Sequence, residues 1–167
     1  MFSAFLSTRS FAQSSLIQQE EVGWVADVRA MRHFTGLRCP DIVANYFRTK
    51  VLASDSNRMA GCVYAGPDGI TLVLRQHQPG TAADVGEVFL KTFQAAGFER
   101  VTGEGAAASG ISFNTRPWLP VNLHETLWYI SGAKADYTIW MNYRFPLQQE
   151  ELSPALTAFT SVLSLQN

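Results

Sequence analysis

The chain has 167 residues, of which 47% are hydrophobic, 16% are charged and 12% are aromatic, and its formal net charge is −1. This length suits one domain with a sizeable core. The near-zero net charge and scattered Lys and Arg residues give no electrostatic basis for binding nucleic acid or an anionic membrane. No apolar run approaches the roughly 20 residues that span a bilayer.

The first 19 residues contain Arg9 but neither Asp nor Glu. Ser10-Phe11-Ala12 fits the small-x-small pattern of a signal peptidase site, although the apolar stretch before it is short for a signal peptide. A mitochondrial presequence is the alternative targeting interpretation, and a flexible N-terminal arm is as well supported as the two targeting interpretations together. We therefore assign residues 1–19 to a targeting remnant or flexible N-terminal arm, and residues 20–167 to a single domain.

Residues 34–76 alternate short apolar runs with turn residues, a pattern that predicts a β-meander. Residues 24–31, before it, fit either a strand or one helical turn. Residues 43–51 are predicted to form one strand, with Val43, Phe47 and Val51 on one face and Arg48 and Lys50 on the other. Gly66-Pro67-Asp68-Gly69 predicts a hairpin turn, because Pro presets φ and Gly accepts a positive φ.

The clearest helix pattern follows, between residues 81 and 97. Thr81 and Asp84 have the spacing of a capping box, and Gly97 is a natural residue just beyond the last turn. Between them lies one apolar stripe formed by Val85, Val88, Phe89 and Phe93.

Residues 121–130 and 137–145 predict a second hairpin, and a C-terminal helix is expected with Ser153 as N-cap and Pro154 in its first position. In the second of these strands, alternate residues share the core-facing side: Tyr137, Ile139, Met141, Tyr143 and Phe145. The sequence therefore predicts an α+β domain, with a mainly antiparallel sheet built from hairpins and packed by two helices. This element order resembles the sandwich of Mog1 and PsbP proteins, which implies a fold but no function.

The two cysteines, Cys39 and Cys62, lie at the ends of neighbouring strand-like segments, with no His or third Cys beside them at metal-ligand spacing. We interpret them as a structural disulfide, the alternatives being two buried thiols or a reactive pair. A disulfide indicates an oxidising compartment, so we expect a periplasmic or secreted protein, with a mitochondrial location as the alternative. The segments 36–40 and 61–64 resemble small exported proteobacterial proteins of uncharacterised function, and this resemblance implies export and a disulfide.

No sequence motif indicates a metal or a cofactor, and we expect neither. The spacing of His33, His77 and His124 matches no zinc signature, so they are interpreted as surface or rim histidines. The Gly-rich segment 103–110 lacks the ending of a phosphate-binding loop and is interpreted as a flexible hairpin loop. An enzymatic alternative remains: a small hydrolase or transferase whose site is assembled from His124, Arg116 and Glu104.

Aromatic residues favour a binding function. Trp118 lies between Pro117 and Pro120, and a Trp in such a loop is often a contact residue. If the strand faces bearing Trp128 and Trp140 coincide, an aromatic–polar surface forms; otherwise a helix covers this face and these Trp residues are core. We hypothesise that the chain is a non-enzymatic exported binding module or accessory subunit that binds a protein partner or a small ligand. A further interpretation is that it is a subunit of a membrane-associated complex. Its expected contact residues are Trp118, Trp128, Trp140, Arg144, His124 and Arg116.

Overall fold

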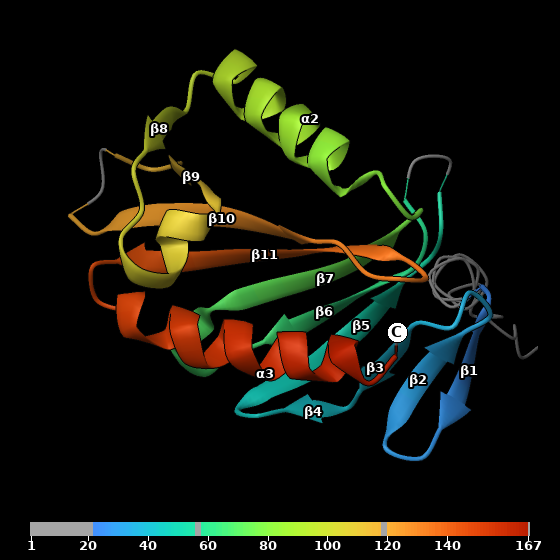
Figure 1. Ribbon diagram of the computed structural model, residues 1–167. Coiled ribbons are helices and arrows are strands. Elements are labelled where there is room, and N and C mark those ends of the chain that lie inside the picture. The colour runs from blue at the N-terminus through green and yellow to red at the C-terminus, as the bar shows by residue number, and fades with distance from the viewer. Residues whose placement is uncertain (1–21, 56–57, 118–119, 167) are drawn as a thin grey trace, which may run out of the picture.

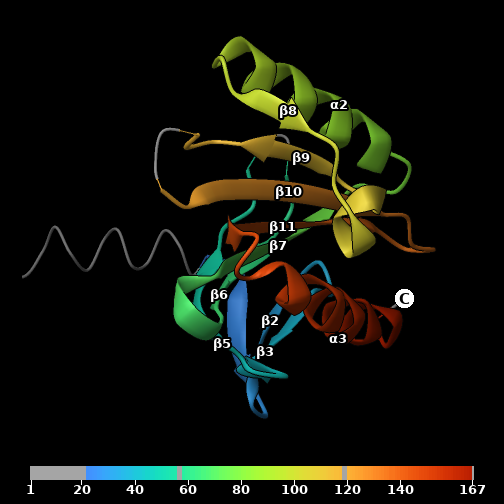
Figure 2. The ribbon, with the colours of Figure 1, turned by 90° about the vertical axis from the view of Figure 1, so that its left-hand side faces the viewer.

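The structure is a computed structural model that describes residues 22–55, 58–117 and 120–166. It contains two antiparallel sheets, one of three strands in the order β1-β2-β3 and one of eight in the order β4-β5-β6-β7-β11-β10-β9-β8. Helix α2 packs on one face of the larger sheet and α3 on the other (Figures 1 and 2). The predicted α+β fold, with its mainly antiparallel sheet and two helices, is confirmed.

The elements run along the chain as follows. The small sheet comprises β1 (Trp24–Asp27), β2 (Ala30–His33) and β3 (Arg38–Pro40). The large sheet comprises β4 (Ile42–Val43), β5 (Tyr46–Leu52), β6 (Gly61–Ala65), β7 (Thr71–His77), β8 (Glu99–Val101), β9 (Ile111–Asn114), β10 (Asn122–Ile130) and β11 (Asp136–Phe145). The helices are α2 (Ala82–Ala95), α3 (Leu152–Ser164) and the short 3-10 helices η1 (Pro67–Gly69), η2 (Gly105–Ser109) and η3 (Gln149–Glu151). Within the described ranges, no helix is long and apolar enough to cross a membrane.

The single strand expected over residues 43–51 is wrong. Ala44 adopts a left-handed φ of 51°, so the chain turns tightly and Val43 pairs with Tyr46 across a short hairpin. A further irregularity between Arg48 and Lys50 shifts the register of β5 against β6. Tyr46 is therefore buried at 1% exposure, whereas Phe47, expected on the same face as Val43 and Val51, is 57% exposed while those two are buried.

The face of the large sheet under α3 forms the main core. Phe159 of α3 makes edge-on ring contacts with Tyr46 and Tyr64, at centroid distances of 5.6 and 4.9 Å. The side of β11 predicted to face the core is confirmed, since Tyr137, Ile139, Met141 and Tyr143 are all buried. The predicted N-cap is wrong: η3 leads directly into α3, so Ser153 already lies inside the helix.

Three hydroxyl groups are joined inside this core. Ser112 Oγ of β9 and Thr126 Oγ1 of β10 are 2.8 Å apart, and Thr126 Oγ1 lies 2.9 Å from the Tyr143 hydroxyl of β11. All three residues are buried, so the chain of hydrogen bonds satisfies polar groups that water does not reach.

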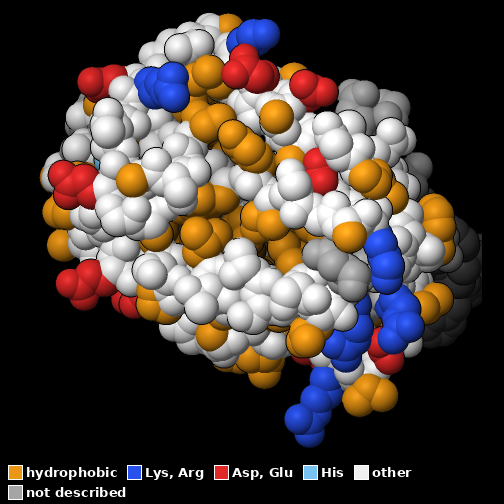
Figure 3. Space-filling model, viewed as in Figure 1, with side chains coloured by type: hydrophobic (Ala, Val, Ile, Leu, Met, Phe, Trp, Pro, Cys, Tyr) orange, Lys and Arg blue, Asp and Glu red, His pale blue; other side chains and the backbone are white. Residues whose placement is uncertain are grey.

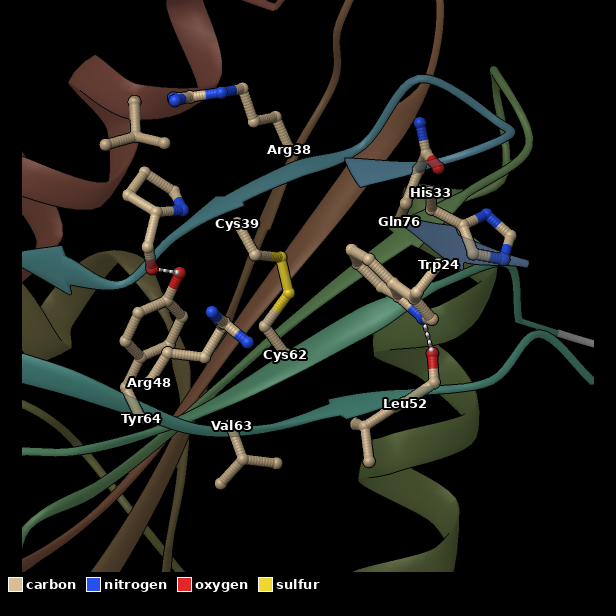
Figure 4. The surroundings of a disulfide bond; sticks show 12 residues. Trp24, His33, Arg38, Cys39, Arg48, Leu52, Cys62, Val63, Tyr64 and Gln76 are labelled. Carbon is tan, nitrogen blue, oxygen red and sulfur yellow. Dashed lines mark hydrogen bonds between the residues drawn. A yellow bond between two sulfur atoms is a disulfide. The ribbon is translucent and has the colours of Figure 1, made fainter. Parts of the chain in front are cut away.

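A disulfide between Cys39 of β3 and Cys62 of β6 ties the small sheet to the large one (Figure 4). Both cysteines are fully buried, and their Cα atoms are 6.5 Å apart. Two hydrogen bonds flank the disulfide: the Tyr64 hydroxyl donates to the Pro40 carbonyl (3.0 Å), and Trp24 Nε1 donates to the Leu52 carbonyl (3.1 Å). The expected disulfide is confirmed, and residues 24–31 lie in the hairpin β1–β2, which runs from Trp24 to His33.

Helix α2 differs from its predicted capping. Thr81 Oγ1 donates to the Gln78 carbonyl and makes no capping bond to the helix, so the expected capping box is wrong. Gly97, with φ of 81°, follows the last turn as predicted. The apolar stripe is only partly covered, and Val88 is 64% exposed.

Charged side chains lie around the edge of the face shown in Figure 3, and hydrophobic side chains gather in a hollow between α2 and α3. Such a distribution agrees with the low charged fraction of the sequence.

Candidate functional site

The strand register separates the residues expected to form one aromatic–polar surface. Across β10 and β11, His124 pairs with Tyr143 and Trp128 with Ile139, so both face α3. Trp140 instead pairs with Leu127, and Arg144 with Leu123, on the face that carries α2. The two faces do not coincide, and the single surface that depended on their coincidence does not form.

Trp128 belongs to the core. It is 3% exposed, and its Nε1 donates a hydrogen bond of 2.9 Å to the Ala106 carbonyl in η2. The segment 103–110, interpreted from the sequence as a flexible hairpin loop, contains the 3-10 helix η2, in which Ala107 is buried.

The remaining expected contact residues are dispersed. Arg144 is exposed, and its guanidinium donates to the Asp68 carbonyl of η1 (3.2 Å). Arg116 is exposed just beyond β9. Trp118 lies outside the described residues. Of the described contact residues expected from the sequence, only Trp140 lines a large cavity on the α2 side of the sheet.

This cavity is a groove of about 1170 Å³ between α2 and the large sheet. Its wall is the apolar stripe of α2, and its floor is the sheet face formed by β5, β6, β7, β11 and β10. The apolar lining consists of Leu52, Met59, Val63, Val73, Val85, Val88, Phe89, Phe93, Leu127 and Trp140.

The groove exists because α2 lies over only one end of the sheet. Phe89 and Phe93 pack on Phe113 of β9, at ring-centroid distances of 5.8 and 5.2 Å. Gly86 brings the helix close to Tyr129 of β10, since a Cβ at this position would meet that ring at 3.1 Å. The helix is thus held against β9 and β10, and the middle of the sheet floor is left without a helical cover (Figure 1).

One carboxyl group faces the groove from β10. Trp140 Nε1 donates to Glu125 Oε2 at 3.2 Å. Burial raises the pKa of Glu125, and the hydrogen bonds from Thr115 and Trp140 and the charge of Arg116 offset part of that rise. Burial therefore disfavours the ionised form of Glu125, and the three neighbouring groups stabilise that form only in part.

The charges along the groove balance. Among the described lining residues, three are basic and three are acidic: Lys50, Arg58, Arg75, Asp55, Asp84 and Glu125. Two of these are paired, since Arg58 lies 3.0 Å from Asp55. Arg75, whose pKa is lowered by burial, donates to the carbonyls of Ala53 and Met59. The groove therefore offers apolar contact without a marked preference for either sign of charge.

The histidines are not at the surface as interpreted from the sequence, because exposures are 1% for His33, 1% for His77 and 7% for His124. His77 borders the groove, and its Nε2 lies 2.9 Å from Thr138 Oγ1. Burial, followed by the charge of Arg75, lowers the pKa of His77 to about 4. His77 is thus a neutral, fixed side chain at neutral pH.

A second cavity, of about 330 Å³, lies at the β8 end of the opposite sheet face. It brings together His124 and Glu104, two residues of the enzymatic alternative, whereas Arg116 does not line it. The His124 ring stacks on Phe145 at a centroid distance of 4.5 Å. In the part of the chain that the structure describes, neither ring nitrogen of His124 hydrogen-bonds a nucleophile or a carboxylate; the catalytic alternative stays a prediction.

Comparison with known proteins finds no matching family model, no matching curated protein and no matching solved structure. The resemblances noted from the element order and from the cysteine segments therefore stay predictions.

Proposed function

We propose that this protein is an exported binding module that holds an elongated apolar ligand, such as an acyl chain, in the groove between α2 and the large sheet. The observation that carries the proposal is the groove itself, about 1170 Å³ in volume, to which both the helical wall and the sheet floor contribute apolar side chains.

The lining of the groove supports an apolar ligand. Valine side chains project from both sides, Val85 and Val88 from α2 and Val63 and Val73 from the sheet. Removal of apolar surface from water is worth roughly 25 cal/mol per Å², so a chain covered on two sides gains affinity along its length. The volume exceeds the roughly 300–1,000 Å³ of common small-molecule sites, which favours a long ligand over a compact one.

The balanced charges support recognition through the chain rather than through a charged head group. Trp140 adds a large, rigid contact surface, and its Nε1 is already engaged by Glu125. Export is supported by the disulfide between Cys39 and Cys62, because such bonds persist in oxidising compartments.

The experiment that tests the proposal measures displacement of a chain-labelled fluorescent fatty acid by palmitate. Val88→Glu places a charge on the exposed part of the groove wall and is expected to weaken binding at least about tenfold, because a carboxylate in contact with an alkyl chain must lose water. Ala83→Glu is the matched control: it adds the same charge to an exposed position of α2 that does not line the groove.

The proposal predicts binding by the unmodified protein and by Ala83→Glu, with a clear loss in Val88→Glu. It is overturned if the fatty acid does not bind, or if the two variants bind it equally. Thermal unfolding of each variant establishes that the fold is intact, which is expected because both positions are exposed.

A further inference from the structure

The smaller cavity is separate from the groove and differs from it in chemistry. It lies on the α3 side of the sheet, between β8, the segment after it and the ends of β10 and β11. Carboxylates, amides and an imidazole contribute to its polar lining: Glu99, Glu104, Asn114, Asn122, His124 and Gln149. Neither Lys nor Arg lines it among the described residues.

His124 is the first indication of a ligand. Its side chain is more than nine-tenths buried and lines the cavity, yet neither ring nitrogen has a hydrogen-bond partner among the described residues. Phe145 stacks on one side of the ring and Tyr143 contacts it edge-on, so the ring is held in place by packing alone. The ring nitrogens are not among the sealed, unsatisfied polar atoms of the described chain, so they are open to the cavity, where one of them can bond a ligand.

The charge around His124 is the second indication. Burial lowers its pKa, so the ring is neutral at neutral pH and one nitrogen accepts a hydrogen bond. The Glu99 carboxylate is close enough to oppose that shift. Glu104 adds a second carboxylate to the rim, and both glutamates are exposed. A group that donates hydrogen bonds and carries positive charge complements this lining.

We propose that the cavity bounded by His124, Glu99 and Glu104 binds a small organic ammonium group. The ammonium donates a hydrogen bond to the free imidazole nitrogen and is attracted by the two carboxylates, while its carbon chain lies against Phe145. The volume of about 330 Å³ lies at the lower end of the roughly 300–1,000 Å³ of common small-molecule sites, so a ligand of a few carbon atoms has room in it. Within the described ranges, no three His, Cys, Asp or Glu side chains are grouped as a metal site; competition with a metal ion is therefore part of the test.

The test is a titration with butylammonium chloride, followed through the imidazole Hε1 signal of His124 by NMR. The chain has only three histidines, and His124→Gln assigns the signal by its loss. We expect the signal to shift with butylammonium but not with butanol, which has the same chain without the charge. Glu99→Gln and Glu104→Gln are each expected to weaken binding about threefold to fivefold, in keeping with exposed charge pairs. Glu150→Gln is the matched control, because Glu150 is exposed near the cavity without lining it.

Salt provides a second readout, since binding through exposed carboxylates weakens as ionic strength rises. The proposal is overturned if butanol shifts the signal as much as butylammonium does, or if butylammonium leaves it unmoved. It is also overturned if neither glutamine variant differs from Glu150→Gln, or if calcium or zinc displaces butylammonium at a lower concentration than butylammonium itself requires.

Discussion

Asp136, the first residue of β11, accepts a hydrogen bond of 2.8 Å from the backbone N–H of Ala82, the first residue of α2. Its other carboxylate oxygen accepts a bond of 3.3 Å from the N–H of Gly132 in the preceding turn. A carboxylate of the sheet thus satisfies a free N–H of the helix, which a capping residue in the chain itself would otherwise do. The wall of the groove is anchored to its floor at this point.

Asp136→Ala is therefore expected to lower the free energy of unfolding by about 1–3 kcal/mol, because two backbone donors lose their partner at a buried site. Hydrogen exchange at the amide of Ala82 is expected to become faster. Thr81→Ala is the matched control, with an expected effect below about 0.5 kcal/mol, since Thr81 does not cap the helix. A larger loss in Thr81→Ala than in Asp136→Ala, measured by urea unfolding, would contradict this assignment.

Replacement of Cys39 and Cys62 together by Ala is expected to cost about 3 kcal/mol of stability, because the bond closes a loop with a sequence separation of 23. Amides of β1, β2 and β3 are expected to lose more protection from hydrogen exchange than those of β10 and β11. The chain-entropy argument fails for this protein if the double variant unfolds at the same urea concentration as the oxidised parent.

Acid is expected to destabilise the fold through His77. The pKa of this residue is lowered from 6.5 to about 4 in the folded protein, so the unfolded chain binds a proton at a pH where the folded one does not. The contribution of His77 to the free energy of unfolding is fully present above about pH 6.5. It is lost progressively as the pH falls toward 4, by about 2–3 kcal/mol in all. The pKa values of His33 and His124 are lowered in the same direction.

His77→Asn removes this titration and keeps a polar side chain beside Thr138. The stability of this variant is expected to fall less steeply between pH 6.5 and 4 than that of the parent, as measured by urea unfolding at several pH values. Identical slopes for the two proteins would show that other groups govern the acid sensitivity.

Trp140→Phe is expected to raise the pKa of Glu125 further. The indole N–H stabilises the charged carboxylate, and phenylalanine keeps the ring packing without that donor. Carboxyl chemical shifts followed against pH measure the change. Trp128→Phe serves as the control, because its N–H bonds Ala106 on the opposite face of the sheet; an equal change in both variants would refute the role given to Trp140.

Turns, strand alternation and helix ends could be predicted from the sequence, because each depends on a few neighbouring residues. The turn at Gly66-Pro67-Asp68-Gly69, the alternation along β11 and the glycine that follows α2 each depend on neighbouring residues, and each is found. The turn after Val43 has no such signal, since Ala44 is not a residue that favours a positive φ.

The candidate site could not be predicted from local sequence patterns, because it depends on the register between strands and on where α2 packs on the sheet. Which faces of β10 and β11 coincide follows from the pairing of His124 with Tyr143, and alternation within either strand does not specify that pairing. One signal did point to the groove: β7 carries apolar residues on both faces, Leu72 and Leu74 toward α3 and Val73 toward α2. A strand that is apolar on both sides is expected to be covered on both sides, yet Val73 lies on the groove floor that α2 leaves open.

The hydrogen-bonded hydroxyls of Ser112, Thr126 and Tyr143 destabilise a shifted register between β9 and β10. A slip of one residue between β9 and β10 would turn Ser112 and Thr126 toward opposite faces and separate the two oxygens. Each buried hydroxyl without a hydrogen-bond partner would then destabilise the slipped structure by on the order of 1–3 kcal/mol. These three residues therefore favour the native alignment of β9 and β10 over an alignment shifted by one residue.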